Sequence, residues 1–338
     1  MRRAAVRALC LLLSLLAFMS CSRARPTVKI GLIAPFEGVH RPLGYEVLAA
    51  VKLAVAQRNA AGGVAGFGIE LVALNDDGVP ATAARQVAAL AADPDVMAMI
   101  GPWQAETAQA AAAALPSAGL TAIIPAALPD ADLARAPGAF RLFAGDEALA
   151  QALLSALPPG AQATIAGPAS AWSSRLIAML PAPDPAAPSA LILTGDAEAV
   201  ARQLTNSPCT RTITPCLAGP AVGTPVVVQR AGAAANGLVW VTSLAPPDCN
   251  GPADAFCQAL TETTGAAPGA YAALAYDAAT VLLAALDAHP KVQRSDISRI
   301  LGGIELQGVA GIVRFDDRRS WAAAPVRLYR VDNGSALR

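Results

Sequence analysis

Between residues 28 and 125 the chain alternates short apolar runs with longer alanine-rich runs, and glycine, proline or paired acids stand at every junction. Apolar, β-branched runs of about four to eight residues predict buried strands, and the alanine-rich runs between them predict helices. The runs expected as strands begin at Val28, Ile69, Val96 and Thr121. This alternation is typical of βαβ crossovers and of a doubly wound parallel sheet.

The loops that follow these strands are the first place to look for a ligand site, because open parallel sheets bind ligands outside the carboxyl ends of their strands. We expect four such loops at one edge of the sheet: Pro35–Leu43, Asn75–Pro80, Gly101–Thr107 and Pro125–Asp130.

A second half-domain of the same kind is expected to begin near Leu142, since 338 residues exceed the usual size of a single core. Its predicted strands cover 163–166, 190–193, 213–217 and 238–241, with helices at 171–180 and 197–205. Further helices are expected at 253–264, 271–288 and 295–301, followed by strands at 311–315 and 326–331. The predicted fold class is therefore α/β, with two doubly wound parallel-sheet lobes.

Composition excludes several classes of protein. Hydrophobic residues make up 54% of the chain and charged residues 15%, which favours a folded globular protein over disorder. The 25 basic and 25 acidic residues cancel, so nothing indicates a nucleic-acid partner. The sequence has no G-x-S-x-G, phosphate-loop or H-E-x-x-H motif, and neither His40 nor His289 has a partner at a recognisable spacing. We therefore expect neither an enzyme nor a cofactor.

The amino terminus predicts export. Three arginines among the first seven residues precede an apolar run at 8–19, which is too short to cross a bilayer as a helix. Residues 1–20 are therefore predicted to be a signal peptide, and Phe18-Met19-Ser20-Cys21 resembles a bacterial lipobox. Lipidation of Cys21 would anchor the protein to a membrane, facing the periplasm or the cell exterior. A plain cleaved secretory signal is the alternative.

The mature chain holds four cysteines in two close pairs, Cys209 with Cys216 and Cys249 with Cys257. Two local disulfides are the simplest arrangement for an exported protein. A zinc site is the rival interpretation, but C-x-x-C spacing is missing and both histidines are distant in sequence, so we expect no metal.

Many segments in order along the chain resemble the leucine/isoleucine/valine-binding type of periplasmic solute-binding protein, the extracytoplasmic receptor of ABC importers. The resemblance covers nearly the whole mature chain. Its main segments are Ile30-Gly-Leu-Ile-Ala-Pro-Phe-Glu-Gly, Leu74-Asn-Asp-Asp-Gly, Ile100-Gly-Pro, Ile124-Pro-Ala-Ala, Phe140-Arg-Leu-Phe, Thr194-Gly-Asp-Ala-Glu, Ala270-Tyr-Ala-Ala-Leu-Ala-Tyr-Asp and Gly311-Ile-Val-Arg-Phe-Asp.

This resemblance implies two lobes joined by a three-segment hinge: residues 27–141 with 250–312, and residues 142–249 with 313–338. It also implies that a small molecule binds between the lobes, that binding shifts the population toward a closed form, and that this form docks on an ABC permease. We expect a monomer with no cofactor.

The resemblance also places candidate ligand-binding residues on the first lobe. The family's serine in the loop Pro102–Thr107 falls on Ala105, and its threonine falls on Leu128, so two hydroxyl anchors are missing. The backbone N–H groups of Ala105, Glu106 and Thr107 stand where a helix begins and can receive an anion or a polar head, but the Glu106 side chain would repel a carboxylate. Ala126 and Gln104 complete this part of the site.

On the second lobe, Trp172 matches the family's aromatic position, and Asp196 replaces a tyrosine and can pair with a cation. Trp103 and Arg41 are further candidates on the first lobe. Each has a structural alternative: the tryptophans can fill lobe cores, and Arg41 can be a solvated loop charge. Likewise, Asp76-Asp77 is expected to fix a turn, and Tyr276-Asp277 is expected to fix helix packing.

The sequence therefore predicts an exported solute-binding lipoprotein that delivers a small polar or amphipathic ligand, an amino acid or a related molecule, to an ABC permease. Loss of the hydroxyl anchors leaves a second possibility, an envelope lipoprotein of the same fold that acts as a regulatory or protein-interaction module. A sensor that reports ligand occupancy to a partner receptor is a third.

Overall fold

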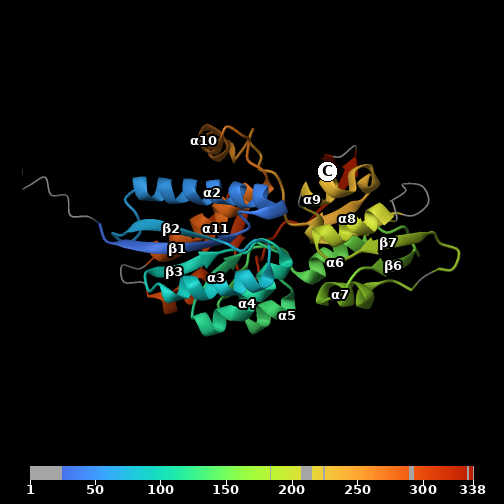
Figure 1. Cartoon of the computed structure of the whole chain (residues 1–338), viewed down its shortest axis with the longest axis horizontal. Helices are drawn as coiled ribbons and strands as arrows, with labels where there is room; N and C mark the ends of the chain where they lie inside the picture. Colours follow the sequence, from blue (N-terminus) through green and yellow to red (C-terminus); the bar gives the residue numbers. More distant parts are fainter. Residues whose placement is uncertain are drawn as a thin grey trace, which may run out of the picture.

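The computed structural model describes residues 25–182, 184–206, 215–223, 225–288, 293–332 and 335–337. The predicted signal peptide, Cys21 and Cys209 lie outside these residues. Two lobes lie side by side along the longest axis of the molecule (Figure 1).

The first lobe is built on a five-stranded sheet in the order β2-β1-β3-β4-β5, with every pair parallel. Helices α2 and α11 pack together on one face, and α3 and α4 pack together on the other (Figure 1). The strands are β1 (Thr27–Ala34), β2 (Gly68–Asn75), β3 (Val96–Ile100), β4 (Ala122–Ile124) and β5 (Ala139–Arg141), and the helices are α2 (Arg41–Ala60), α3 (Pro80–Ala92), α4 (Ala105–Ala118), α5 (Asp130–Arg135) and α11 (Ala270–Asp287).

The second lobe carries a six-stranded sheet in the order β13-β12-β9-β8-β7-β6. Its strands β6 to β9 are parallel, and β12 and β13 add antiparallel strands at one edge. The strands are β6 (Gln162–Ala166), β7 (Ser189–Leu193), β8 (Cys216–Ala218), β9 (Val239–Thr242), β12 (Arg327–Asp332) and β13 (Ser335–Leu337), and the helices are α6 (Asp146–Leu154), α7 (Ala171–Met179), α8 (Ala197–Asn206) and α9 (Pro225–Ala231).

The chain passes between the two sheets three times, after β5, after β9 and before β12. This path agrees with the expected three-segment hinge, while the residue limits of each lobe stay a prediction. Between the second and third passages lie α10 (Asp254–Thr264), α11, α12 (Ile297–Leu301) and the hairpin of β10 (Glu305–Gln307) and β11 (Ile312–Arg314).

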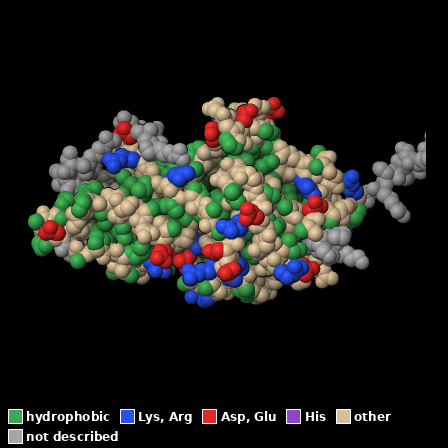
Figure 2. Space-filling model, turned by 180° about the vertical axis from the view of Figure 1, so that it is seen from behind, with side chains coloured by type: hydrophobic (Ala, Val, Ile, Leu, Met, Phe, Trp, Pro, Cys, Tyr) green, Lys and Arg blue, Asp and Glu red, His purple; other side chains and the backbone are tan. Residues whose placement is uncertain are grey.

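Helix α11 is apolar enough and long enough to cross a membrane, but most of its surface is buried in the molecule. Its alanines and leucines pack in the first lobe's core beside α2, as is typical of a core helix. The face shown in Figure 2 carries acidic and basic side chains next to one another, as the zero net charge leads one to expect.

Strand β5 was not expected from the sequence, because its last residue is a buried arginine. Arg141 is 2% exposed; its guanidinium forms an ion pair with Asp130 at 2.7 Å and donates to the carbonyl oxygen of Leu128 at 2.7 Å and to Ser320 Oγ. These partners compensate the buried charge. A short strand that ends in a compensated charge breaks the apolar pattern that marks the other strands.

One of the two expected disulfides is present, between Cys249 and Cys257 just before and within α10. Cys216 is buried at the start of β8. Its expected partner, Cys209, lies outside the described residues, so that pairing stays a prediction.

Candidate functional site

Two adjoining cavities lie between the lobes, where the loops after β3 and β4 face the loops after β7 and β8. The smaller has a volume of about 40 Å³ and the larger about 270 Å³. All four loops are at carboxyl ends of parallel strands, where such sheets bind ligands. The loops after β3 and β4 are two of the four expected from the sequence, His40 comes from a third, Pro35–Leu43, and the fourth, Asn75–Pro80, lines neither cavity. Both cavities are lined by Ala105, Glu106, Ala127, Asp196, Pro220 and Ala221.

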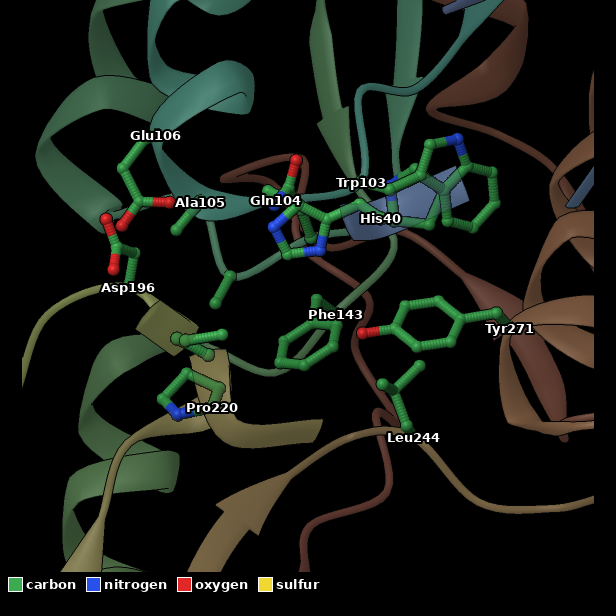
Figure 3. Close-up of a pocket in the computed structure, with 15 residues that line it drawn as sticks. His40, Trp103, Gln104, Ala105, Glu106, Phe143, Asp196, Pro220, Leu244 and Tyr271 are labelled. Atoms are coloured by element: carbon green, nitrogen blue, oxygen red, sulfur yellow. The ribbon is translucent and has the colours of Figure 1, made fainter. Parts of the chain in front are cut away.

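Two carboxylates face each other across these cavities, one from each lobe (Figure 3). Glu106 lies in the first turn of α4. Asp196 lies just before α8, and its Oδ1 accepts a hydrogen bond from the N–H of Ala199 at 2.7 Å, so it caps that helix. Burial raises the pKa of Glu106, and the negative charge of Asp196 raises it further. The two cavities together, called the cleft below, therefore bring like charges together.

The smaller cavity has aromatic walls. The Trp103 and Tyr271 rings meet edge to face, with centroids 6.4 Å apart, and Phe143 lies on the same side as Tyr271 (Figure 3). Tyr271 is in the first turn of α11, where Glu46 Oε1 accepts a hydrogen bond from the N–H of Ala272 at 2.8 Å. Burial raises the pKa of the Tyr271 phenol, so this ring is neutral.

Three polar atoms of residues that line the smaller cavity are buried without a hydrogen-bond partner among the described residues: Trp103 Nε1, Gln104 Oε1 and His40 Nδ1. Burial lowers the pKa of His40, while the charges of Glu198 and Asp196 act in the opposite direction. Unpaired buried polar atoms cost stability, commonly about 1–3 kcal/mol each. They are frequent at sites where a ligand or ordered water supplies the missing partner.

Trp172 gives the larger cavity its aromatic wall. It lies at the start of α7, whose first turn is fixed by a capping box between Ser170 and Ser173. The indole packs against the backbone of Gly219, where a methyl group would lie 2.7 Å from Trp172 Nε1.

Six of the expected ligand-binding residues line the smaller cavity: Trp103, Gln104, Ala105, Glu106, Ala126 and Asp196. Trp172 lines the larger cavity.

Three expected residues line neither cavity. Thr107 is fully buried and its hydroxyl donates to the Gln104 carbonyl oxygen, and Leu128 is fully buried in the first lobe's core. Arg41 is exposed, with its guanidinium 5.2 Å from the centre of the Tyr45 ring. Thr107 and Leu128 therefore pack inside the first lobe, and Arg41 lies at the exposed start of α2.

Sequence reasoning missed several lining residues. His40 stands beside Arg41 in the first of the four expected loops, so its position was a usable signal. Phe143 and Leu244 come from the segments that pass between the sheets, and Asp146 begins α6. Side chains on such connections are placed by tertiary contacts, and no periodic pattern marks them.

Among the described residues, the charged side chains on the cavity walls are all acidic. Glu106, Asp146 and Asp196 line the cavities, and no lysine or arginine does so among the described residues. Within the described part of the chain, no three His, Cys, Asp or Glu side chains are grouped as metal ligands would be.

A family model described as periplasmic binding protein matches residues 27–182 and 186–336, which is most of the chain. The chain belongs to the periplasmic binding protein family. No curated protein matches it.

Solved structures share the fold across both lobes. The branched-chain amino acid transporter substrate-binding protein LivJ from Streptococcus pneumoniae, in complex with isoleucine, has a TM-score of 0.76 and 20% identity over 92% of this chain and 97% of its own. The leucine-binding protein LivK from Thermotoga maritima has a TM-score of 0.76 and 21% identity over the same shares. A solute-binding protein from R. palustris in complex with benzoate has a TM-score of 0.71 and 17% identity over 92% and 95%.

These findings confirm the two-lobed type I fold and the resemblance to leucine- and isoleucine-binding proteins. Like other periplasmic binding proteins, the chain is a solute-binding protein, and the matched structures are substrate-binding transport proteins rather than enzymes.

Proposed function

We propose that this protein is the extracytoplasmic solute-binding component of an ABC importer, which captures a small polar or amphipathic molecule between its lobes and delivers it to a membrane permease. The observation that carries the proposal is the pair of adjoining cavities between the lobes, lined by residues from both. A molecule held there contacts both lobes at once.

Contacts with both lobes explain how ligand binding favours the closed form of the protein. A ligand that touches Glu106 and Trp103 on one lobe and Asp196 and Trp172 on the other interacts fully only when the lobes are together. It therefore shifts the population toward the closed form by the difference in its affinity for the two forms. The step is a binding equilibrium and needs no covalent chemistry.

The proposed site keeps seven of the residues expected from the sequence: Trp103, Gln104, Ala105, Glu106, Ala126, Trp172 and Asp196. Tyr271 and Phe143 join them because they form the aromatic side of the smaller cavity. The three unpaired buried polar atoms support this assignment, since a bound molecule would supply partners for them.

We further propose that the protein is exported and anchored through a lipid on Cys21. The basic residues and the apolar run that precede Cys21 support this. In the bacterial host, Cys21→Ser should release the protein from the membrane fraction, whereas the unaltered chain should stay with membranes after a high-salt wash. Equal release of both chains would favour a plain secretory signal.

Ligand capture is tested with protein purified directly from its host under native conditions. Mass spectrometry after denaturation should identify a small molecule in stoichiometric amount. Adding that molecule back to emptied protein should stabilise the fold by about 2.7 kcal/mol at a hundredfold excess over Kd. Ala127→Phe, which fills space at the wall shared by both cavities, is the matched control and should abolish the shift. A chain that carries no molecule and gains no stability from amino acids, amines or aromatic acids would contradict the proposal.

A second candidate function is a regulatory or protein-interaction module of the same fold. It is favoured by the small volume of the aromatic cavity, about 40 Å³, and by the alanine and leucine that stand in place of the family's two hydroxyl anchors. Uptake separates the two: deletion of the chain should abolish import of its ligand if it serves a permease, and should leave import unchanged if it does not.

A further inference from the structure

We propose that the ligand of this cleft is an organic cation without a carboxylate, and that its charge is held between Glu106 of the first lobe and Asp196 of the second. The inference rests on the proposed function and specifies the class of solute. It differs from an amino-acid site, in which one lobe must neutralise a carboxylate.

The start of α4 shows why a ligand carboxylate is disfavoured. A helix amino terminus normally attracts an anion, because its first N–H groups are unpaired and its dipole is positive there. Here Glu106 stands in that first turn, and its own backbone N–H opposes the rise of its pKa by favouring the ionised form. The chain thus supplies its own anion beside the N–H groups that a bound carboxylate would use.

The rest of the cleft offers an anion no compensating charge. The side chains that line the two cavities include three carboxylates and, among the described residues, no lysine or arginine. Two arginines, Arg141 and Arg175, act on the charge of Asp146, but neither lines a cavity, and Arg141 is already paired with Asp130 at 2.7 Å. An anion entering this space would lose hydration without gaining a cationic partner, which is costly.

A cation, by contrast, would relieve an existing conflict. Glu106 and Asp196 face each other from opposite lobes (Figure 3), so bringing the lobes together brings two negative charges together. A positive group between them interacts favourably with both, and it does so only when the lobes are together. The pair therefore couples closure to the charge of the guest.

The aromatic walls fit the same class of ligand. Because Glu106 and Asp196 line both cavities, a cation held between them has Trp103, Phe143 and Tyr271 on one side and Trp172 on the other. Aromatic faces attract ammonium and amidinium groups and pack against the apolar group that such ions carry. Tyr271 is neutral, so it adds no competing charge.

Matched pairs of probes test the inference on the emptied mature protein by isothermal titration calorimetry. Isopentylamine is leucine without its carboxylate, and benzylamine and benzamidine are cationic counterparts of benzoate. Choline extends the set to a quaternary ammonium ion. At least one cation should bind at least about tenfold more tightly than its matched acid or amino acid, and its affinity should fall as salt rises.

Two variants test whether Glu106 and Asp196 hold the positive charge of the ligand. Glu106→Gln keeps the shape of the side chain, and Asp196→Asn removes the charge while retaining a residue that caps helices well. Each should weaken binding of the best cation at least about tenfold, with a thermal unfolding midpoint close to that of the parent. Glu262→Gln, on the exposed surface of α10, removes one charge away from the cleft and should leave affinity unchanged.

The outcomes separate this inference from the proposed function. If leucine, isoleucine or benzoate binds and the matched cations do not, the cationic class is wrong and solute capture stands. If no probe of either charge binds, the cationic class is wrong, and solute capture is then decided by whether the chain purified from its host carries a molecule. If a cation binds but neither Glu106→Gln nor Asp196→Asn weakens it, the assigned residues are wrong and the inference falls.

Discussion

Two acids of the first lobe, one in its core and one at the cleft, show how a structural carboxylate differs from one that awaits a partner. Asp277, inside α11, is fully buried, and its two oxygens accept hydrogen bonds from the N–H groups of Val309 at 2.6 Å and Ala310 at 2.7 Å. Glu106, at the cleft, faces Asp196. Burial raises the pKa of both acids. Their partners, rather than their burial, separate the roles.

Asp277→Ala should give the largest loss of stability. The change leaves two N–H groups between β10 and β11 without their acceptor and opens a small void, so unfolding should become easier by about 3–4 kcal/mol. Chemical denaturation followed by circular dichroism measures this. Glu106→Ala is the matched variant from the other region, and it should shift the unfolding free energy by less than about 1 kcal/mol. Equal losses would erase the distinction between the two acids.

The pH dependence of stability sharpens the same comparison. Burial raises the pKa of Asp277 to about 6, although the two backbone N–H groups oppose this. The folded state then binds a proton more tightly than the unfolded chain does. This contribution to the free energy of unfolding is fully present below about pH 4, declines as pH rises toward 6, and is lost above that. A rise of about two pKa units corresponds to about 3 kcal/mol.

Asp277→Asn isolates this effect, because Asp76, whose pKa burial also raises to about 6, keeps its contribution in both chains. Between pH 4 and pH 7 the unfolding free energy of the parent should fall relative to that of the variant by up to about 3 kcal/mol. Parallel pH profiles would show that Asp277 titrates at its ordinary pKa, because the two backbone hydrogen bonds would then fully offset the effect of burial.

The sequence predicts the two lobes well because most strands are apolar runs set between helices, and burial on both faces of a parallel sheet requires that pattern. It predicts β6, β7, β9 and the ends of α7, α8 and α10 to within one or two residues. It fails at β5, where the buried Arg141 interrupts the run, and at β10, where Glu305 and Gln307 are exposed and only Leu306 is half-buried.

The residues of the site also divide into those that the sequence predicts and those that it does not. Trp103, Glu106 and Asp196 were predictable because each lies in the few residues from the end of a parallel strand through the first turn of the next helix, at the edge where such sheets bind ligands. Leu128 and Thr107 also follow strands, yet their side chains point into the lobe's core. A loop position does not determine side-chain direction, and the residues contributed by the connecting segments depend on how the two lobes meet.

Two glycines offer a second matched test. A methyl group at Gly308 would collide with the carboxylate of Asp277, which two hydrogen bonds hold in place, so Gly308→Ala should destabilise the fold by about 2 kcal/mol. A methyl group at Gly219 would meet the Trp172 indole, which borders the larger cavity and can move into it. Gly219→Ala should therefore change unfolding by less than about 1 kcal/mol while lowering ligand affinity. Thermal unfolding and calorimetry measure the two effects, and a reversed order would contradict this assignment.

The smallest expected effect is the change in stability of the ligand-free protein when Glu106 is replaced. This effect best separates a structural role of Glu106 from a ligand-binding role. Glu106→Gln removes the repulsion with Asp196 and the cost of burying an ionised carboxylate, the two causes that raise the pKa of Glu106. At pH 7 the ligand-free variant should be as stable as the parent or more stable by less than about 1 kcal/mol, and Glu262→Gln should be neutral. A structural acid behaves in the opposite way, as Asp277 should. A clear loss of stability in Glu106→Gln would therefore show that Glu106 holds the fold rather than a guest.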